Sequence, residues 1–455
     1  MSETVPEAHP RDRLRRDLGL RDATLLIVSG VIGSGIFFTP GPIAALLPHP
    51  GVILAAWVVG GLLSLAGALA NAELGAMFPR AGGDYVYLRE AFHPIAGFLV
   101  GWLSFFVIYA GTIATLAAAF AAGLGSFFSI SATGEAAVAV GLVLVVSALN
   151  YVGVRWGARV NNWTAIVKII ALVALGLLGP VFGEGDFSNL RPILDGAAEL
   201  PLVAFGLALS PVLFSYLGWN SSVYVASEIR DPGRNLPRSL FLGLAICTAV
   251  YLLVNAVYLY ALPVASLSGE ANAGEAAARA LFGDIGGRFV GALALLSVLG
   301  TLNATILVGP RIAYAMALDR LFFPGVDRAH ARFRTPGVAI GLQALAAILI
   351  LVGLETFEAA LTYTTFAIVL ATMADVFALY RLRRTQPGRA RPYRAWGYPW
   401  VPALYVLANA GVAAALIWGR PLECVLGVGL LAAGLPFYWI FSRRQGRLAP
   451  AEKVE

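Results

Sequence analysis

The chain has 455 residues, of which 59% are hydrophobic and only 13% are charged, whereas about 25% are charged in a typical soluble domain. So apolar a composition excludes an ordinary soluble enzyme or binding module. The formal net charge is +6, but the arginines are scattered over short segments instead of gathered on one face, so we do not expect a nucleic-acid partner.

Apolar runs that could each cross a bilayer as a helix of about 18 to 25 residues recur along most of the sequence. We therefore predict an all-α integral membrane protein with twelve transmembrane helices in the cell membrane. The first run is long and has no small-residue cleavage site, so we expect it to remain in the mature protein. The predicted spans are 23–45, 51–78, 92–126, 134–153, 161–182, 201–227, 239–262, 285–318, 336–354, 357–381, 399–418 and 422–441.

Basic residues divide these connections into two sets. Of the 32 lysines and arginines, 26 lie in the two tails and in or at the edge of every second connection, and two lie deeper within spans. The other four, Arg191, Arg279, Arg288 and Arg420, lie in or at the edge of the remaining connections. The positive-inside rule then places both tails, 1–22 and 442–455, in the cytoplasm. The basic run at 381–394 could also contact the head groups of membrane lipid.

The first predicted span contains GVIGSGIFFTPG at residues 30–41. Gly33 and Gly35 flank Ser34, and glycine disfavours a helix by about 1 kcal/mol relative to alanine. An unwound stretch inside a bilayer persists only where it lines a protein cavity, but small residues also let membrane helices pack closely. This span alone does not separate the two interpretations.

The sixth predicted span has a second interruption, where Pro211 precedes FSYLGWN at 214–220. Paired interruptions at corresponding positions of two halves indicate a binding site at the bilayer midplane of transporters built from inverted repeats. A half-helix that restarts after Gly35 would offer N–H groups to a carboxylate. Carbonyls exposed where the sixth span unwinds would accept bonds from an ammonium. Together the two breaks predict an amino acid as the ligand.

At these residues the sequence resembles the amino acid, polyamine and organocation transporter superfamily, and within it the L-type amino acid transporter family and bacterial serine/threonine exchangers. The resemblance continues through NAELGAMFPRAGGDYVYLRE at 71–90, SEIRDPGRNLPRSL at 227–240, LNATILVGPRIAYAMALDR at 302–320 and FRTPGVAI at 333–340. It implies alternating-access transport or exchange of amino acids. It also implies a five-plus-five inverted repeat, 23–182 and 201–381, with two further spans at 399–441.

The resemblance also implies roles for individual residues. The substrate carboxylate and backbone would meet Val31, Ser34, Gly35 and Ile36. Phe214 would be an aromatic gate, and the amine side would be lined by Ser215, Tyr216 and Leu217. The unwound backbone would be supported by Gly33, Gly218, Trp219 and Asn220. No cofactor and no catalytic residue is expected.

Lys168 is the only lysine within a predicted span, and a lysine at the bilayer centre costs about 2.5 to 3.5 kcal/mol on insertion scales. Its amine either reaches the interface or, as the resemblance implies, stands where sodium-coupled relatives hold a sodium ion and ties the fifth span to the first break. Sodium dependence is then not expected. Asn303 would either bond across helices or reach the substrate.

The other charged residues near the spans have structural interpretations. We expect Glu73 to pair with loop arginines, Glu228 to form a latch beside Arg230 and Arg234, and Asp375 and Arg311 to be pairing or helix-end residues. The four histidines lie in tails or loops, and Cys247 and Cys424 lack partner spacing, so no metal site is predicted.

The sequence therefore favours an exchanger of neutral amino acids, because we see no acidic residue near the two breaks to compensate a cationic side chain. A proton-coupled permease is the nearest alternative, and a membrane-embedded enzyme or a receptor is a less favoured class. The resemblance implies that a heavy subunit, where one exists, is bound through a cysteine in the loop after the third span. The corresponding loop at 125–135 has no cysteine, so we expect a monomer without a disulfide-linked heavy subunit.

Overall fold

The computed structural model describes residues 11–125, 127–191, 202–353 and 357–448. In these ranges the chain is helical, and the one β-type pairing is an isolated bridge between Leu18 and Ile229. The longer helices are α1 (Leu20–Val31), α4 (Pro50–Met77), α6 (Pro94–Leu103), α7 (Ala110–Gly125), α8 (Ala132–Tyr151), α9 (Val154–Phe182), α10 (Leu202–Tyr216), α12 (Pro232–Ala261), α14 (Ala273–Val308), α16 (Gly337–Gly353), α17 (Phe357–Thr385), α18 (Trp400–Gly419), α19 (Pro421–Ala432) and α20 (Gly434–Leu448).

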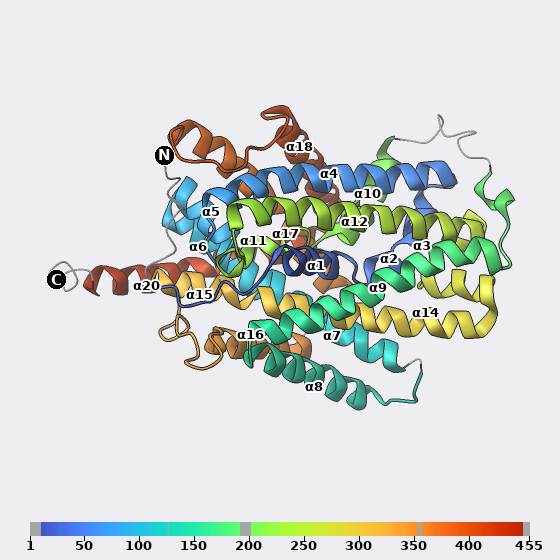
Figure 1. Ribbon diagram of the computed structural model, residues 1–455, viewed down its shortest axis with the longest axis horizontal. Helices are drawn as coiled ribbons and strands as arrows, with labels where there is room; N and C mark the ends of the chain where they lie inside the picture. The colour runs from blue at the N-terminus through green and yellow to red at the C-terminus, as the bar shows by residue number, and fades with distance from the viewer. Residues whose placement is uncertain (1–10, 126, 192–201, 354–356, 449–455) are drawn as a thin grey trace.

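Short helical elements connect these rods. They are α2 (Gly35–Phe38), α3 (Pro40–Leu46), α5 (Asp84–Ala91), the π-helix η1 (Ser104–Tyr109), η2 (Phe187–Leu190), α11 (Ser221–Tyr224), η4 (Ala226–Glu228), α13 (Val264–Leu267) and α15 (Pro310–Leu318). Most long helices run along the long axis of the molecule, and α1 lies in the middle of the bundle (Figure 1), in contact with α9, α12 and α14.

The described residues contain ten helical segments that are long and apolar enough to cross a membrane. Two shorter apolar helices, Val203–Tyr216 and Gly337–Gly353, coincide with the sixth and ninth predicted spans. Exposed large hydrophobic side chains cover the outer helices, among them Trp163, Ile170 and Leu177 of α9. The chain is a multi-pass membrane protein.

Some bounds differ from the predicted ones. The eighth span was expected to begin at residue 285, but α14 begins at Ala273, where the Asn272 side chain accepts a hydrogen bond from the Glu275 N–H. Charged residues lower the mean hydropathy of the first part of α14, so this part was not included in the predicted span. The helix kinks at Gly283, whose φ is +70°. The twelfth predicted span is divided into α19 and α20, which meet at Ala433.

The predicted loop between the second and third spans contains helix α5, which is largely buried. Gly82 and Gly83 precede it with φ of +105° and +49°, a backbone that only glycine adopts readily. Asp84 at its first position is 1% exposed. The charged and aromatic composition of α5 is typical of a surface loop. For this reason this segment was predicted from the sequence to lie outside the core.

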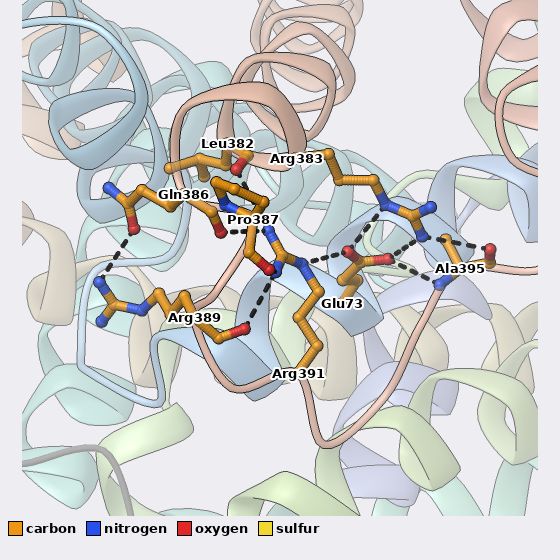
Figure 2. A network of polar contacts seen from close by, with 8 residues as sticks. All are labelled: Glu73, Leu382, Arg383, Gln386, Pro387, Arg389, Arg391 and Ala395. Carbon is orange, nitrogen blue, oxygen red and sulfur yellow. Dashed lines mark hydrogen bonds and ion pairs between the residues drawn. The ribbon is translucent and has the colours of Figure 1, made fainter.

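The predicted pairing of Glu73, near the end of α4, with loop arginines is confirmed. Its buried carboxylate accepts bonds from Arg383 Nε at 3.0 Å and Nη2 at 2.5 Å, from Arg391 Nε at 3.2 Å, and from the Ala395 N–H at 2.7 Å (Figure 2). This network fixes the end of α4 to the end of α17 and to the segment that follows it.

Glu228 has a different partner from the expected one. Its carboxylate accepts bonds from Arg311 Nε at 2.7 Å and Nη2 at 3.2 Å, and both side chains are at most 1% exposed. Arg230 instead donates to the Arg16 carbonyl. The pair joins η4 to α15, because Glu228 ends η4 and Arg311 lies in the first turn of α15.

Candidate functional site

The first break comprises residues 32–34, between α1 and α2. Ile32 has φ −74° and ψ +79°, outside the helical range. The N–H groups of Ser34, Gly35 and Ile36 have no acceptor among the described residues. Three free donors at the start of a restarted helix suit an anionic group, although α2 is too short to make a site by itself.

The second break comprises residues 217–220, between α10 and α11. Gly218 has φ +96°, and the Ser221 hydroxyl and N–H both bond its carbonyl, at 2.7 and 3.0 Å. The carbonyls of Tyr216 and Leu217 accept no hydrogen bond from the described residues. The second break therefore offers acceptors where the first offers donors.

The two breaks contact each other through their backbones. A Cβ added to Gly35 would lie 2.6 Å from Ser215 Oγ and 2.8 Å from Ser215 Cα, and one added to Gly218 would lie 2.9 Å from the Gly30 carbonyl carbon. The glycines thus serve both interpretations left open by the sequence, since they permit the break and also the close packing.

Tyr251 of α12 contacts both breaks through its hydroxyl group. Its buried hydroxyl lies 2.7 Å from the Val31 carbonyl and 2.8 Å from the Ser215 carbonyl. A phenol has one hydrogen, so the two carbonyls share one donor. Thr39 adds a second link, because its hydroxyl donates to the Gly35 carbonyl and contacts Ser215 Oγ, both at 2.9 Å.

Lys168 is completely buried on α9 and does not reach an interface. Its Nζ donates to the Ile32 carbonyl at 2.7 Å and the Ser29 carbonyl at 3.3 Å, and lies 3.5 Å from Thr301 Oγ1. The Ser297 hydroxyl of α14 lies within hydrogen-bond distance of the Ile32 and Gly33 carbonyls, at 2.9 and 3.0 Å, and its one hydrogen serves either of them. The first break is therefore held by α9 and α14 through its carbonyl groups.

A cavity of about 130 Å³ lies between the breaks. Since one buried water needs roughly 10 to 15 Å³ on this measure, the cavity has room for a small organic molecule. Its wall includes the predicted residues Val31, Gly33, Ser34, Gly35, Phe214, Ser215, Leu217, Gly218 and Asn220.

Five predicted residues lie away from this wall: Lys168, described above, and four others. Ile36 and Tyr216 are fully buried in the apolar core, so Ile36 would meet a ligand only through its backbone. Tyr216 donates to the Trp57 carbonyl at 3.0 Å. Trp219 packs against Tyr405 with 6.4 Å between ring centroids. Asn303 donates to the Gly157 carbonyl at 3.0 Å and accepts from Asn150 at 2.9 Å. Of its two predicted roles, these contacts correspond to hydrogen bonding across helices.

The hydroxyl groups that other helices contribute to the cavity wall were not predicted from the sequence. The π-helix η1 carries Ile108 and Tyr109 to the cavity, and α7, α14 and α17 add six threonines: Thr112, Thr115, Thr301, Thr305, Thr364 and Thr372. The Oγ1 atoms of Thr115 and Thr364 are buried without a hydrogen-bond partner among the described residues. Threonine inside an apolar span gives no sequence signal of its own, because its hydroxyl commonly bonds the helix backbone.

Asp84 corrects the expectation that no acidic residue lies near the breaks. It lines the cavity, and its Oδ2 accepts a 2.5 Å bond from the Tyr224 hydroxyl of α11. The motif that contains it was noticed, but its assignment to a loop removed it from the candidate list. Within the described ranges, no group of three or more metal-ligating side chains is present.

Comparison with known proteins gives consistent matches over nearly the whole chain. A family model described as amino acid permease matches residues 18–427. The serine/threonine exchanger SteT of Bacillus subtilis is 31% identical over 443 residues, which cover 96% of this chain and 99% of that protein. The mouse large neutral amino acids transporter small subunit 2 is 29% identical, with 96% and 84% covered. The human Asc-type amino acid transporter 1 is also 29% identical, with 96% and 84% covered.

Matches of this extent establish the family of the chain. They also agree with the family resemblance noted in the sequence. The chain belongs to the amino acid permease family of the amino acid, polyamine and organocation superfamily, whose members are membrane transporters and not enzymes.

Proposed function

We propose that this chain is a sodium-independent exchanger of neutral L-amino acids that works by alternating access. One observation carries the proposal: two helix breaks from distant parts of the sequence adjoin one cavity, one with free N–H groups at Ser34 to Ile36 and the other with free carbonyls at Tyr216 and Leu217. These complementary groups suit the carboxylate and the ammonium of an amino acid.

In this proposal Phe214, on the cavity wall, is the aromatic gate. Gly33, Gly218, Trp219 and Asn220 support the unwound backbone, and Tyr251 is added as the residue that aligns the two breaks. Exchange is supported by the relative named as a serine/threonine exchanger. A neutral substrate is supported by the relative named for large neutral amino acids and by the threonines and apolar groups of the wall.

Independence from sodium is supported by Lys168. Its ammonium lies among the carbonyl oxygens of Ser29 and Ile32 and the hydroxyl of Thr301. Unwound carbonyls coordinate sodium in coupled transporters of inverted-repeat architecture. A fixed ammonium there satisfies the same oxygens and repels a metal cation.

The proposed architecture has twelve spans, with inverted repeats at 23–182 and 201–381, two additional spans at 399–441, and both tails in the cytoplasm. The protein acts without a disulfide-linked second subunit. Both of its cysteines, Cys247 and Cys424, are buried, so neither thiol can reach a partner chain.

The test uses purified protein in liposomes loaded with L-serine. We expect uptake of labelled L-serine and L-threonine that requires internal amino acid and is unchanged when choline replaces sodium. N-acetylserine and ethanolamine, which lack the free amine and the carboxylate respectively, should not compete. Competition by either compound would contradict recognition by the two breaks, and uptake into empty vesicles would contradict obligatory exchange.

A panel of twenty amino acids defines the side chain. Neutral members should compete best, because the carboxyl of Asp84 is already engaged by Tyr224. Best competition by arginine or lysine would contradict the neutral assignment.

A further inference from the structure

Two buried carboxyl groups lie beside the cavity. Asp84 of α5 and Asp375 of α17 are 1% and 0% exposed, and the two carboxyl groups interact where α5 packs against α17. Asp84 Oδ2 also accepts from the Tyr224 hydroxyl at 2.5 Å, and Asp375 Oδ2 from the Asn71 amide at 3.1 Å. The Oδ1 atom of each group is buried and has no donor among the described residues.

No cation compensates this pair within the described part of the chain. The groups that face it from the surrounding helices are tyrosines and an amide: Tyr87 of α5, Tyr109 of η1, Tyr224 of α11, Tyr405 of α18 and Asn71 of α4. Arg89, the cation of α5, is bound instead to Glu90 and Asp319. Asp375 was expected to be a pairing or helix-end residue, but its side-chain hydrogen bond comes from the neutral Asn71 amide, and no cation pairs with it among the described residues.

Two carboxylates in contact inside a protein cannot both remain ionised. A hydrogen bond between two carboxyl groups also requires a proton on one of them, since a carboxylate only accepts. The two Oδ1 atoms are the oxygens left for that proton. We propose that Asp84 and Asp375 form a proton-binding site that adjoins the substrate cavity and makes the transport cycle depend on pH.

The connection to transport runs through Tyr224. This residue ends α11, the half-helix that follows the second break, and Asn220 of that break lies 3.4 Å from its hydroxyl. The Tyr224 hydroxyl stabilises the anionic form of Asp84. When α11 moves during alternating access, Asp84 loses this donor and is itself protonated from water, so that the pair then holds two protons. When α11 returns, the proton leaves.

This coupling rests on the proposed transport function, but the proton site itself does not. The first measurement is therefore infrared spectroscopy of the purified protein without substrate. We expect a band of a protonated carboxylic acid at neutral pH that disappears in Asp375→Asn and in Asp84→Asn. Asp284→Asn is the matched control, because Asp284 is 86% exposed on α14 beside Arg279. Persistence of the band in both variants would overturn the proton site.

Asp375→Asn preserves the charge and shape of the singly protonated pair, because the amide can donate to Asp84 and cannot ionise. We therefore expect this variant to fold. The Asp84→Asn variant and the pH titration of the wild-type band decide the question if Asp375→Asn does not fold.

The second measurement is amino acid exchange in liposomes with equal pH on both sides. The wild-type rate should fall as pH rises, by up to about tenfold per pH unit for one required proton, and the Asp284→Asn rate should follow it. The Asp84→Asn rate should lose this dependence, because the proton that is taken up when α11 moves resides on Asp84. Identical profiles for wild type and Asp84→Asn would overturn the coupling. Absence of exchange in every protein, with the infrared band present, would instead refute the proposed function.

Discussion

The Tyr251 hydroxyl is a point where a single atom connects the two halves of the site. It lies within hydrogen-bond distance of both the Val31 and the Ser215 carbonyls. The Val31 carbonyl also accepts from the Gly33 N–H at 2.8 Å, whereas the Ser215 carbonyl has no other donor among the described residues. Removing one donor from buried acceptors costs about 1 to 3 kcal/mol. A residue outside both breaks therefore sets their relative position.

Tyr251→Phe should weaken substrate binding by roughly 5- to 100-fold, as 1.4 kcal/mol corresponds to a factor of ten. Equilibrium binding of labelled L-serine to detergent-solubilised protein measures the change. Tyr258→Phe is the matched control on the same helix, because the Tyr258 hydroxyl is buried and has no hydrogen-bond partner among the described residues. Equal affinities of the two variants would show that the hydroxyl does not align the breaks.

Lys168 acts on the opposite side of the first break, where its ammonium donates to the Ile32 and Ser29 carbonyls. Hydrogen bonds from charged groups contribute about 1.5 to 3 kcal/mol each. Lys168→Met keeps the length of the side chain and removes the donor. We expect it to reduce substrate affinity by roughly 10- to 100-fold, measured by the same binding assay.

Ile169→Met, at the next position of α9, controls for altered packing and should bind nearly as well as wild type. If Lys168→Met binds with unchanged affinity in sodium-free buffer, the first break does not need the ammonium.

At the scale of elements, α4 and α17 are joined by a charged network instead of by apolar packing alone. Glu73 receives four hydrogen bonds from Arg383, Arg391 and the Ala395 N–H. Because its carboxylate is buried, removing its charge would leave two partly buried guanidinium groups without compensation. The network thus holds α17, and with it Asp375, against α4.

Glu73→Gln should destabilise the protein by about 3 to 5 kcal/mol, the usual cost of breaking a buried ion pair from one side. Thermal unfolding followed by tryptophan fluorescence measures it as a lower midpoint. Glu275→Gln removes one of the two acidic partners of Arg279, which is 56% exposed, and should change stability by no more than about 1 kcal/mol. A similar midpoint for both variants would refute a structural role of the network.

At the scale of the whole molecule, the arginines predict which end of the bundle faces the cytoplasm. Asp186 to Ser188 lie in a connection with few basic residues, and Thr385 lies in the arginine-rich one. In a protein with Cys247→Ala and Cys424→Ala, an impermeant thiol reagent added to intact cells should label Ser188→Cys. It should label Thr385→Cys only after the membrane is opened. The reverse pattern would invert the proposed topology.

The sequence predicted those features that disturb an otherwise apolar pattern. Gly33, Ser34 and Gly35 were noticed because they interrupt a hydrophobic run, and Lys168 because a charge in a span is costly. Tyr251 and Thr301 were not predicted, because each lies in a regular helix and its partner comes from a distant segment. Asp84 was seen, but a short charged helix has the composition of a loop, and only the packing of α5 against α17 reveals its burial.

The backbone contact of Gly35 with Ser215 and of Gly30 with Gly218 has a consequence for how such transporters diversify. The part of the ligand that all amino acids share would be recognised by main-chain atoms, which point mutations leave in place. The part that differs would meet side chains such as Ile108, Thr112 and Ala304 on other helices. A descendant of this protein can therefore acquire a new substrate through changes on that wall while the two breaks stay as they are.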